Sequence, residues 1–219
     1  MSHQPIQNAW RRAPSRIAIH FWFKCFGTLG FIALFFAAYV YLLRHPVYAV
    51  TVIPAIWLDH LIAVQPLFLP FYLSLWLYVS LPPMLMVSRQ AIIEYGIWMG
   101  GLCLAALAIF YFQPTTVGPT GIDWSLYPGM AILRGMDAAG NACPSLHVAT
   151  AVFSCLWLCQ YLPALGFGRL TRWLAVAWCV AIVYSTMATK QHMALDVAAG
   201  IILSLIVFAA FALSRRREY

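Results

Sequence analysis

Long apolar stretches separated by short polar turns constrain this chain more than any other feature of its sequence. About 18 apolar residues in a row are enough to cross a bilayer as a helix, and several segments reach or approach that length. Only 9% of the residues are charged, whereas soluble domains have about 25%. We therefore expect an all-α polytopic membrane protein, a single membrane domain over residues 1–219 with six transmembrane helices in a bundle. The spans are predicted at about residues 17 or 21 to 43, 61–87, 95–112, 145–162, 173–187 and 192–213.

The distribution of basic residues predicts the orientation of this bundle. Six spans place both termini on one side of the membrane, and of the 13 Lys and Arg residues only Arg44, Arg134 and Lys190 fall on the other side. Cytoplasmic loops carry the excess of Lys and Arg. We therefore expect a cytoplasmic N-terminal arm at residues 1–16 and a basic cytoplasmic tail at 214–219.

The longest polar segment, residues 113–143, is rich in Pro and Gly and falls on the non-cytoplasmic side of this topology. A loop of this length without periodicity of its own is usually functional. The six cysteines lack metal-ligand spacing and lie mostly in apolar runs, so we expect neither a metal site nor a disulfide framework.

The first polar cluster follows this loop, at the start of the fourth predicted span. Pro144 suits the first position of a helix, which places Ser145 in the first turn among unpaired backbone N–H groups. Such a helix start can bind an anion, and His147 puts a titratable imidazole within a turn of it. Ser145 could instead be only a helix cap, and His147 a histidine satisfied by the backbone.

The second cluster lies where the fifth and sixth spans meet, on the same side of the membrane. His192 and Asp196 are four residues apart, so on a helix the carboxylate can hold one imidazole nitrogen and leave the other free to act. Ionisable groups in spans are functional by default, although such a pair can also join helices structurally. Lys190 could either bind an anion or extend to lipid headgroups.

Together the two histidines suit phosphoryl transfer. His192 would attack phosphorus and form a phosphohistidine, while His147 would protonate the leaving group and later help to activate water. The negative charge on the phosphoryl oxygens requires positioned donors. The candidates for this phosphate-binding role are Ser145, Ser185, Lys190, Arg134 and Asn141, although Arg134 and Asn141 could merely order the loop.

The run Pro144-Ser145-Leu146-His147, followed by Ser185, His192 and Asp196, resembles the second and third signature motifs of the type 2 phosphatidic acid phosphatase superfamily. The resemblance covers the third to sixth spans. It implies a six-helix membrane enzyme that acts on lipid phosphates or diphosphates without a metal or other cofactor. It also implies that His192 is the nucleophile, Asp196 its partner and His147 the acid.

The chain departs from the family pattern at three cationic positions. Thr186 stands where an Arg usually follows the Ser of the third motif, and Tyr111 and Gly118 stand where the first motif has Lys and Arg. We hypothesise that Lys190 and Arg134 compensate.

We expect a lipid phosphatase of the bacterial inner membrane, with its site facing the periplasm. The predicted substrates are polyprenyl diphosphate, phosphatidic acid, phosphatidylglycerol phosphate or similar lipids, and the predicted partners are this substrate and membrane lipids, not nucleic acid. One alternative is a phosphotransferase or headgroup synthase that passes the phosphoryl group to a lipid or sugar hydroxyl. A second alternative is a catalytically inactive membrane scaffold.

Overall fold

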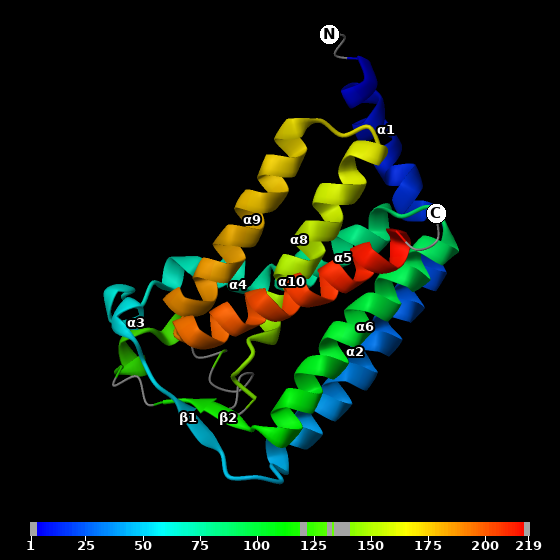
Figure 1. The fold of residues 1–219 in the computed structure, drawn as a ribbon. Coiled ribbons are helices and arrows are strands. Elements are labelled where there is room, and N and C mark those ends of the chain that lie inside the picture. Colours follow the sequence, from blue (N-terminus) through cyan, green and yellow to red (C-terminus); the bar gives the residue numbers. More distant parts are fainter. Residues whose placement is uncertain (1–3, 119–121, 131–132, 134–140, 217–219) are drawn as a thin grey trace.

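The computed structural model describes residues 4–118, 122–130, 133 and 141–216, and these residues are mostly helical. Within the described residues, six helical segments are long and apolar enough to cross a membrane (Figure 1), which agrees in number with the six predicted spans. They are α2 (Phe21–Arg44), the segment Pro66–Leu85, α6 (Arg89–Phe112), α8 (Leu146–Ala164), α9 (Arg169–Ala188) and α10 (Ala194–Arg216).

The second of these segments is not one continuous helix. It consists of the 3-10 turn η1 (Pro66–Phe68), then α4 (Leu69–Leu73) and α5 (Leu75–Leu85). Pro66 begins η1 and Pro70 lies at the start of α4, because proline fits the first turn of a helix, where its missing N–H has no helical partner. The break between α4 and α5 falls at Ser74.

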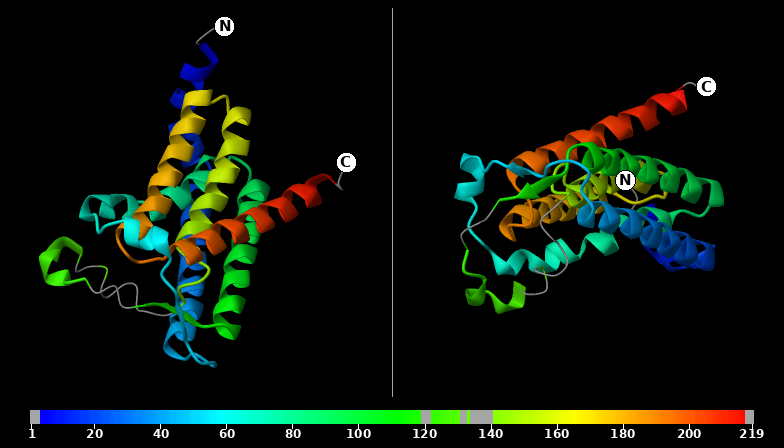
Figure 2. Two further views of the ribbon diagram at one scale, coloured as in Figure 1. Left: turned by 60° about the vertical axis from the view of Figure 1, so that its left-hand side comes forward. Right: turned by 90° about the horizontal axis from the view of Figure 1, so that it is seen from below.

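Helix α8 is the centre of the bundle and packs against α9, α10, α5 and α6. Its buried residues are mostly apolar, and several of them meet aromatic side chains of the neighbouring helices. The Trp157 ring stacks on Phe211 of α10 with 4.6 Å between centroids and meets Tyr95 of α6 edge-on at 5.4 Å. α10 crosses α8 obliquely and extends beyond it (Figure 2).

Where the structure describes the chain, two shorter helices, α1 and α3, lie outside the six long segments. The N-terminal arm predicted at residues 1–16 contains α1 (Gln4–Ala18), which contacts α5. The connector between the first two long segments contains α3 (Trp57–Leu61). The described part of the 113–143 loop contains the 3-10 turns η2 (Trp124–Leu126) and η3 (Pro128–Met130).

A two-stranded parallel sheet is an exception to the all-α prediction. β1 (Thr51–Ile53) pairs with β2 (Thr115–Val117), with Val52 opposite Thr116. The sheet therefore joins the segment after α2 to the segment after α6, at the end of the bundle where α3 and the α9–α10 turn also lie (Figure 1).

Candidate active site

Ser145 caps the N-terminus of α8. Its backbone is extended, with φ −61° and ψ 107°, and its buried hydroxyl oxygen accepts the N–H of Val148 at 3.3 Å. The helix therefore begins at Leu146, and Pro144 precedes the cap. The expectation that Pro144 is the first helical residue was wrong, because Ser145 provides the better start by satisfying a free N–H of the first turn.

A tight turn joins α9 to α10 and holds His192. The N–H of Lys190 donates to Met187 O at 3.0 Å, and the N–H of Gln191 donates to Thr186 O at 3.0 Å. These are the two bonds of a Schellman motif, in which the residue after the cap has a left-handed backbone. Lys190 occupies that position with φ 58°, although glycine is the usual residue there.

His192 and Asp196 form the pair that their spacing predicts. The Nδ1 atom of His192 lies 2.6 Å from Oδ2 of Asp196, and the Asp196 side chain is fully buried while that of His192 is 13% exposed. α10 begins at Ala194, two residues later than predicted, so the imidazole projects from the turn while the carboxylate lies in the first helical turn. An ionised carboxylate can only accept a hydrogen bond, so Nδ1 of His192 carries the hydrogen. Nε2 therefore has the lone pair that a nucleophile needs.

The two polar clusters are joined through the main chain. The N–H of Ser145 donates to the carbonyl oxygen of Asp196 at 3.0 Å. Gly200, one turn further along α10, lies so close to α8 that a β-carbon added there would be 2.5 Å from the Ser145 carbonyl oxygen. The start of α8 and the start of α10 are therefore fixed to each other, and His147 and His192 line one cavity.

Tyr72 holds the imidazole of His147. The two rings stack with 4.0 Å between centroids and an interplanar angle of 14°, and Nε2 of His147 lies 3.0 Å from the Tyr72 carbonyl oxygen. This carbonyl belongs to the last turn of α4, where the N–H of the cap residue Ser74 also bonds to it. Because a carbonyl only accepts, Nε2 carries a hydrogen, and a proton that His147 gains or loses while this bond holds is on Nδ1.

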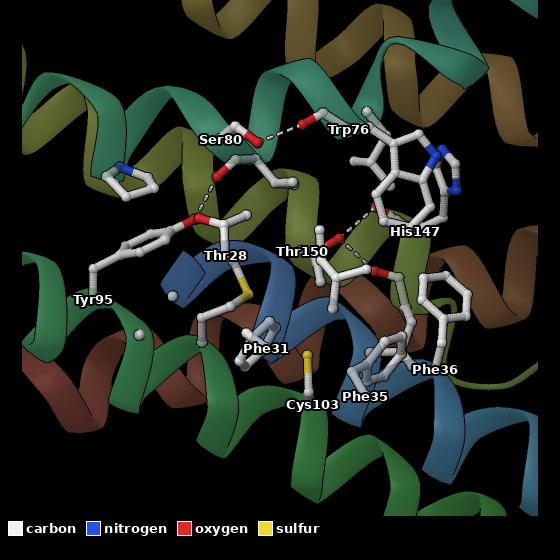
Figure 3. A pocket seen from close by; sticks show the side chains of 18 of the residues that line it. Thr28, Phe31, Phe35, Phe36, Trp76, Ser80, Tyr95, Cys103, His147 and Thr150 are labelled. Atoms are coloured by element: carbon white, nitrogen blue, oxygen red, sulfur yellow. Dashed lines mark hydrogen bonds between the residues drawn. The ribbon is translucent and has the colours of Figure 1, made fainter. Parts of the chain in front are cut away.

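A cavity of about 440 Å³ lies between α2, α5, α6 and α8. His147 and His192 are at one end and Lys24 lines the other, and α2 lines it from Phe23 to Tyr39. These 16 residue steps correspond to about 24 Å along a helix. Most of the lining side chains are apolar, and in Figure 3 Phe31, Phe35 and Phe36 rise from α2 toward the helices that carry Trp76 and His147.

Asn141 is the predicted phosphate-binding residue that lines the cavity. It is buried, its φ is 43°, and its side-chain amide donates to Tyr39 O at 3.1 Å. Asparagine tolerates this left-handed backbone better than most residues. The amide group is thereby placed at the histidine end of the cavity.

The other predicted phosphate-binding residues lie elsewhere. The buried Ser185 hydroxyl donates to Ile182 O at 2.6 Å within α9. The Lys190 ammonium donates to Asp59 O at 2.8 Å and, by a very short bond, to Ile62 O. Among the described residues, Ser145, Ser185 and Lys190 do not line the cavity. Arg134 lies outside the described residues.

Two titratable groups beside the histidine pair have shifted pKa values. Burial lowers the pKa of Lys190, and the Asp59 carboxylate partly opposes this effect. Burial raises the pKa of the Cys143 thiol, and the negative charge of Asp196 raises it further. The described residues contain no group of three or more His, Cys, Asp or Glu side chains placed to hold a metal ion.

Sequence reasoning missed three contributions to this region. Tyr72 acts partly through its backbone carbonyl, which leaves no signal in the side-chain pattern. Thr150, one turn after His147, lines the cavity and bonds to Leu146 O at 2.8 Å. Asp59 belongs to neither polar cluster of the sequence, although a buried carboxylate in a chain with only 9% charged residues is itself a signal.

The fold and site define a helical protein with membrane-spanning potential and a paired-histidine cavity. A sequence model of the PAP2 superfamily matches residues 96–219, and the chain belongs to this superfamily, as its resemblance to the type 2 phosphatidic acid phosphatases predicted. Membership and the six apolar helices indicate a membrane protein and suggest phosphatase or phosphotransferase activity. No curated protein and no solved structure matches the chain significantly.

Proposed function

We propose that this protein is an integral membrane phosphatase that hydrolyses a lipid mono- or diphosphate through a phosphohistidine. The observation that carries the proposal is the cavity, because it joins the two histidines to an apolar interior. A soluble phosphate ester would gain nothing from this apolar lining, whereas burial of a hydrocarbon chain contributes about 0.8 kcal/mol for each methylene.

In the first step, the Nε2 lone pair of His192 attacks phosphorus and the bond from phosphorus to the leaving oxygen breaks. Asp196 stabilises the imidazolium that forms, because its buried carboxylate already holds Nδ1–H at 2.6 Å. His147 donates a proton from Nδ1 to the leaving oxygen, since its Nε2 hydrogen is held by Tyr72. The products are the dephosphorylated or monophosphate lipid and phosphohistidine.

In the second step, water attacks the phosphohistidine. His147, now neutral at Nδ1, accepts the proton of this water, the P–N bond breaks, and inorganic phosphate leaves. The Asn141 amide supports binding of the phosphoryl oxygens, since it lies at the histidine end of the cavity. Phosphate binding by Ser145, Ser185 and Arg134 stays a prediction.

The site is proposed to face the periplasm of a bacterial inner membrane. The start of α9, with Arg169 and Arg172, and the basic helix α1 lie at the end of the bundle opposite the α9–α10 turn (Figure 1). Basic residues favour the cytoplasmic side. This distribution supports cytoplasmic termini and an outward-facing histidine pair.

The proposal is tested with purified protein in lipid nanodiscs and a panel of polyprenyl diphosphate, phosphatidic acid and phosphatidylglycerol phosphate. We expect release of inorganic phosphate from at least one lipid, and loss of this release in His192→Ala. Turnover that persists in His192→Ala, or a wild-type protein inactive on every member of the panel, contradicts the proposal. The inactive result would favour the scaffold alternative.

A phosphotransferase is the second candidate function, and the residue that favours it is Thr186. It replaces the arginine of the family motif, and its hydroxyl donates to Val183 O at 2.8 Å within α9. Fewer cations at the phosphate would suit an acceptor that is itself bound in the apolar cavity. Adding a lipid or sugar alcohol distinguishes the two functions, because a transferase forms a new phosphoester and a phosphatase releases only phosphate.

A further inference from the structure

Asp59 connects α3 to the turn that carries His192. Its side chain is buried, with one carboxylate oxygen accepting the N–H of Ala194 at 2.8 Å and the other accepting the N–H of Ile56 at 2.8 Å. Ala194 is the first residue of α10 and lies midway between His192 and Asp196. A negative charge at a helix N-terminus is favourable in addition to the hydrogen bond, so Asp59 caps α10 from another part of the chain.

Lys190 makes the reverse connection, from the turn to α3. Its ammonium donates to the carbonyl oxygens of Asp59 and Ile62, which belong to the last turn of α3 and the residue after it. The main chain adds a third connection, in which the N–H of Gln65, three residues after Ile62, donates to the carbonyl oxygen of Ala188 at the end of α9 at 2.9 Å. The turn is therefore bound to α3 on both sides of His192.

The backbone of Lys190 indicates that its side chain is used. Its φ of 58° lies in the region where glycine is favoured, and the Schellman turn that ends α9 would form more easily with glycine. A lysine here retains a strained backbone and provides an ammonium that reaches α3. A surface role near lipid headgroups would not place this ammonium on two carbonyl oxygens.

We propose that Asp59 and Lys190 are positioning residues, which clamp the α9–α10 turn to α3 and so fix the imidazole of His192 for attack. This inference rests on the proposed function for its catalytic consequence. Neither Asp59 nor Lys190 lines the cavity. The clamp assigns to Lys190 a role different from the compensation for missing motif cations predicted from the sequence.

Lys190→Gly separates positioning from folding, because glycine relaxes the left-handed backbone while the link to α3 is lost. Asp59→Ala removes the other half of the clamp, and Asp59→Asn restores one acceptor for Ala194 N–H. His60→Ala, at an exposed neighbour on α3, is the matched control. A displacement of about 1 Å at a reacting group can cost about 10²-fold in rate.

We expect kcat to fall 10- to 100-fold in Lys190→Gly and Asp59→Ala, as a displacement of the reacting imidazole by about 1 Å implies. KM and the inhibition constant of inorganic phosphate should stay within about twofold of their wild-type values, because phosphate binding is not changed. Asp59→Asn should recover part of kcat, and His60→Ala should match wild type. Unchanged kcat in both clamp variants overturns the proposal. A large loss of phosphate inhibition in Lys190→Gly also overturns it, because that result shows direct phosphate binding.

Hydrogen exchange of peptides covering residues 188–196 provides a test that needs no turnover. We expect faster exchange in this segment for both clamp variants and no change for His60→Ala. Exchange that is unchanged here, or raised equally throughout the chain, contradicts a local clamp. A wild-type protein without hydrolytic activity would refute the proposed function, while this measurement would still decide whether the clamp exists.

Discussion

Gly200 of α10 lies directly against the backbone of Ser145, the cap of α8. A β-carbon at position 200 would be 2.5 Å from the Ser145 carbonyl oxygen and 3.3 Å from Cβ of Val148. Helix α8, which carries His147, and helix α10, which carries Asp196, thus approach each other backbone to backbone at this point. The Ser145 N–H to Asp196 O bond lies one turn away and depends on this approach.

Gly200→Ala should therefore impair the site more than its single methyl group suggests. The new β-carbon must push α10 away from α8 because its nearest neighbour is main chain, and such overpacking costs about 1–3 kcal/mol. We expect a loss of kcat of about 10²-fold and a lower Tm, measured by phosphate release and thermal unfolding. Gly101→Ala on α6, where nothing lies within 4 Å, is the control, and equal effects of the two variants would contradict this reasoning.

Asp196→Asn should leave the fold intact and reduce kcat by about 10⁴-fold, as loss of the orienting carboxylate does in other histidine sites. The amide provides no negative charge for the imidazolium and can favour the other tautomer of His192. Phosphate release and the yield of acid-labile phosphohistidine both measure this effect. A kcat within tenfold of wild type would show that the 2.6 Å pair is structural.

Gly27→Leu should obstruct the cavity. Gly27 lines it and has open space around its α-carbon, so a leucine side chain would displace about two methylenes of a bound chain. At about 0.8 kcal/mol for each methylene, kcat/KM for a long-chain lipid phosphate should fall about 10-fold, with a smaller effect on a short-chain analogue.

Gly30→Leu is the matched control for this test, since Gly30 lies one turn further along α2 in open space and does not line the cavity. Equal effects on long-chain and short-chain substrates in Gly27→Leu would exclude the cavity as the site of the hydrocarbon chain.

The pKa of the Cys143 thiol depends on the charge of Asp196. Burial and this carboxylate raise the pKa of the Cys143 thiol, so less thiolate is present at a given pH. The pH at which alkylation reaches half its maximal rate should therefore lie above the ordinary thiol pKa of about 8.5. In a chain with Cys143 as its single cysteine, Asp196→Asn should move this midpoint to lower pH, although not fully, since burial remains.

The control for Cys143 is Asp123→Asn, which removes an exposed carboxylate. An equal shift in this control, or no shift in Asp196→Asn, would show that the Asp196 charge does not act on the thiol. Rates of iodoacetamide labelling over a pH series measure both variants.

The long elements could be predicted from the sequence because their signals are local. Apolar length alone indicated the six helical segments that are long enough to span a membrane, and the four-residue spacing of His192 and Asp196 predicted their contact. The ends were less accurate, since α6 begins at Arg89 and not near Tyr95. The cytoplasmic orientation of the termini stays a prediction.

Contacts between distant parts of the chain could not be predicted in this way. β1 and β2 are three residues each, too short for a pattern of their own, and the chain between them runs from α3 to the end of α6. Asp59 and Ala194 are 135 residues apart, and their bond depends on how the whole bundle closes. The predicted helix start at Pro144 was two positions too early, because proline and serine both suit helix starts.

The interruption at Ser74 has a consequence for how such a protein could be stabilised. A designer who replaced the break between α4 and α5 with an uninterrupted transmembrane helix would gain regular hydrogen bonds in lipid. The same change would turn the Tyr72 carbonyl back into the helix and release the His147 ring. An improved membrane span would in this case be a poorer enzyme.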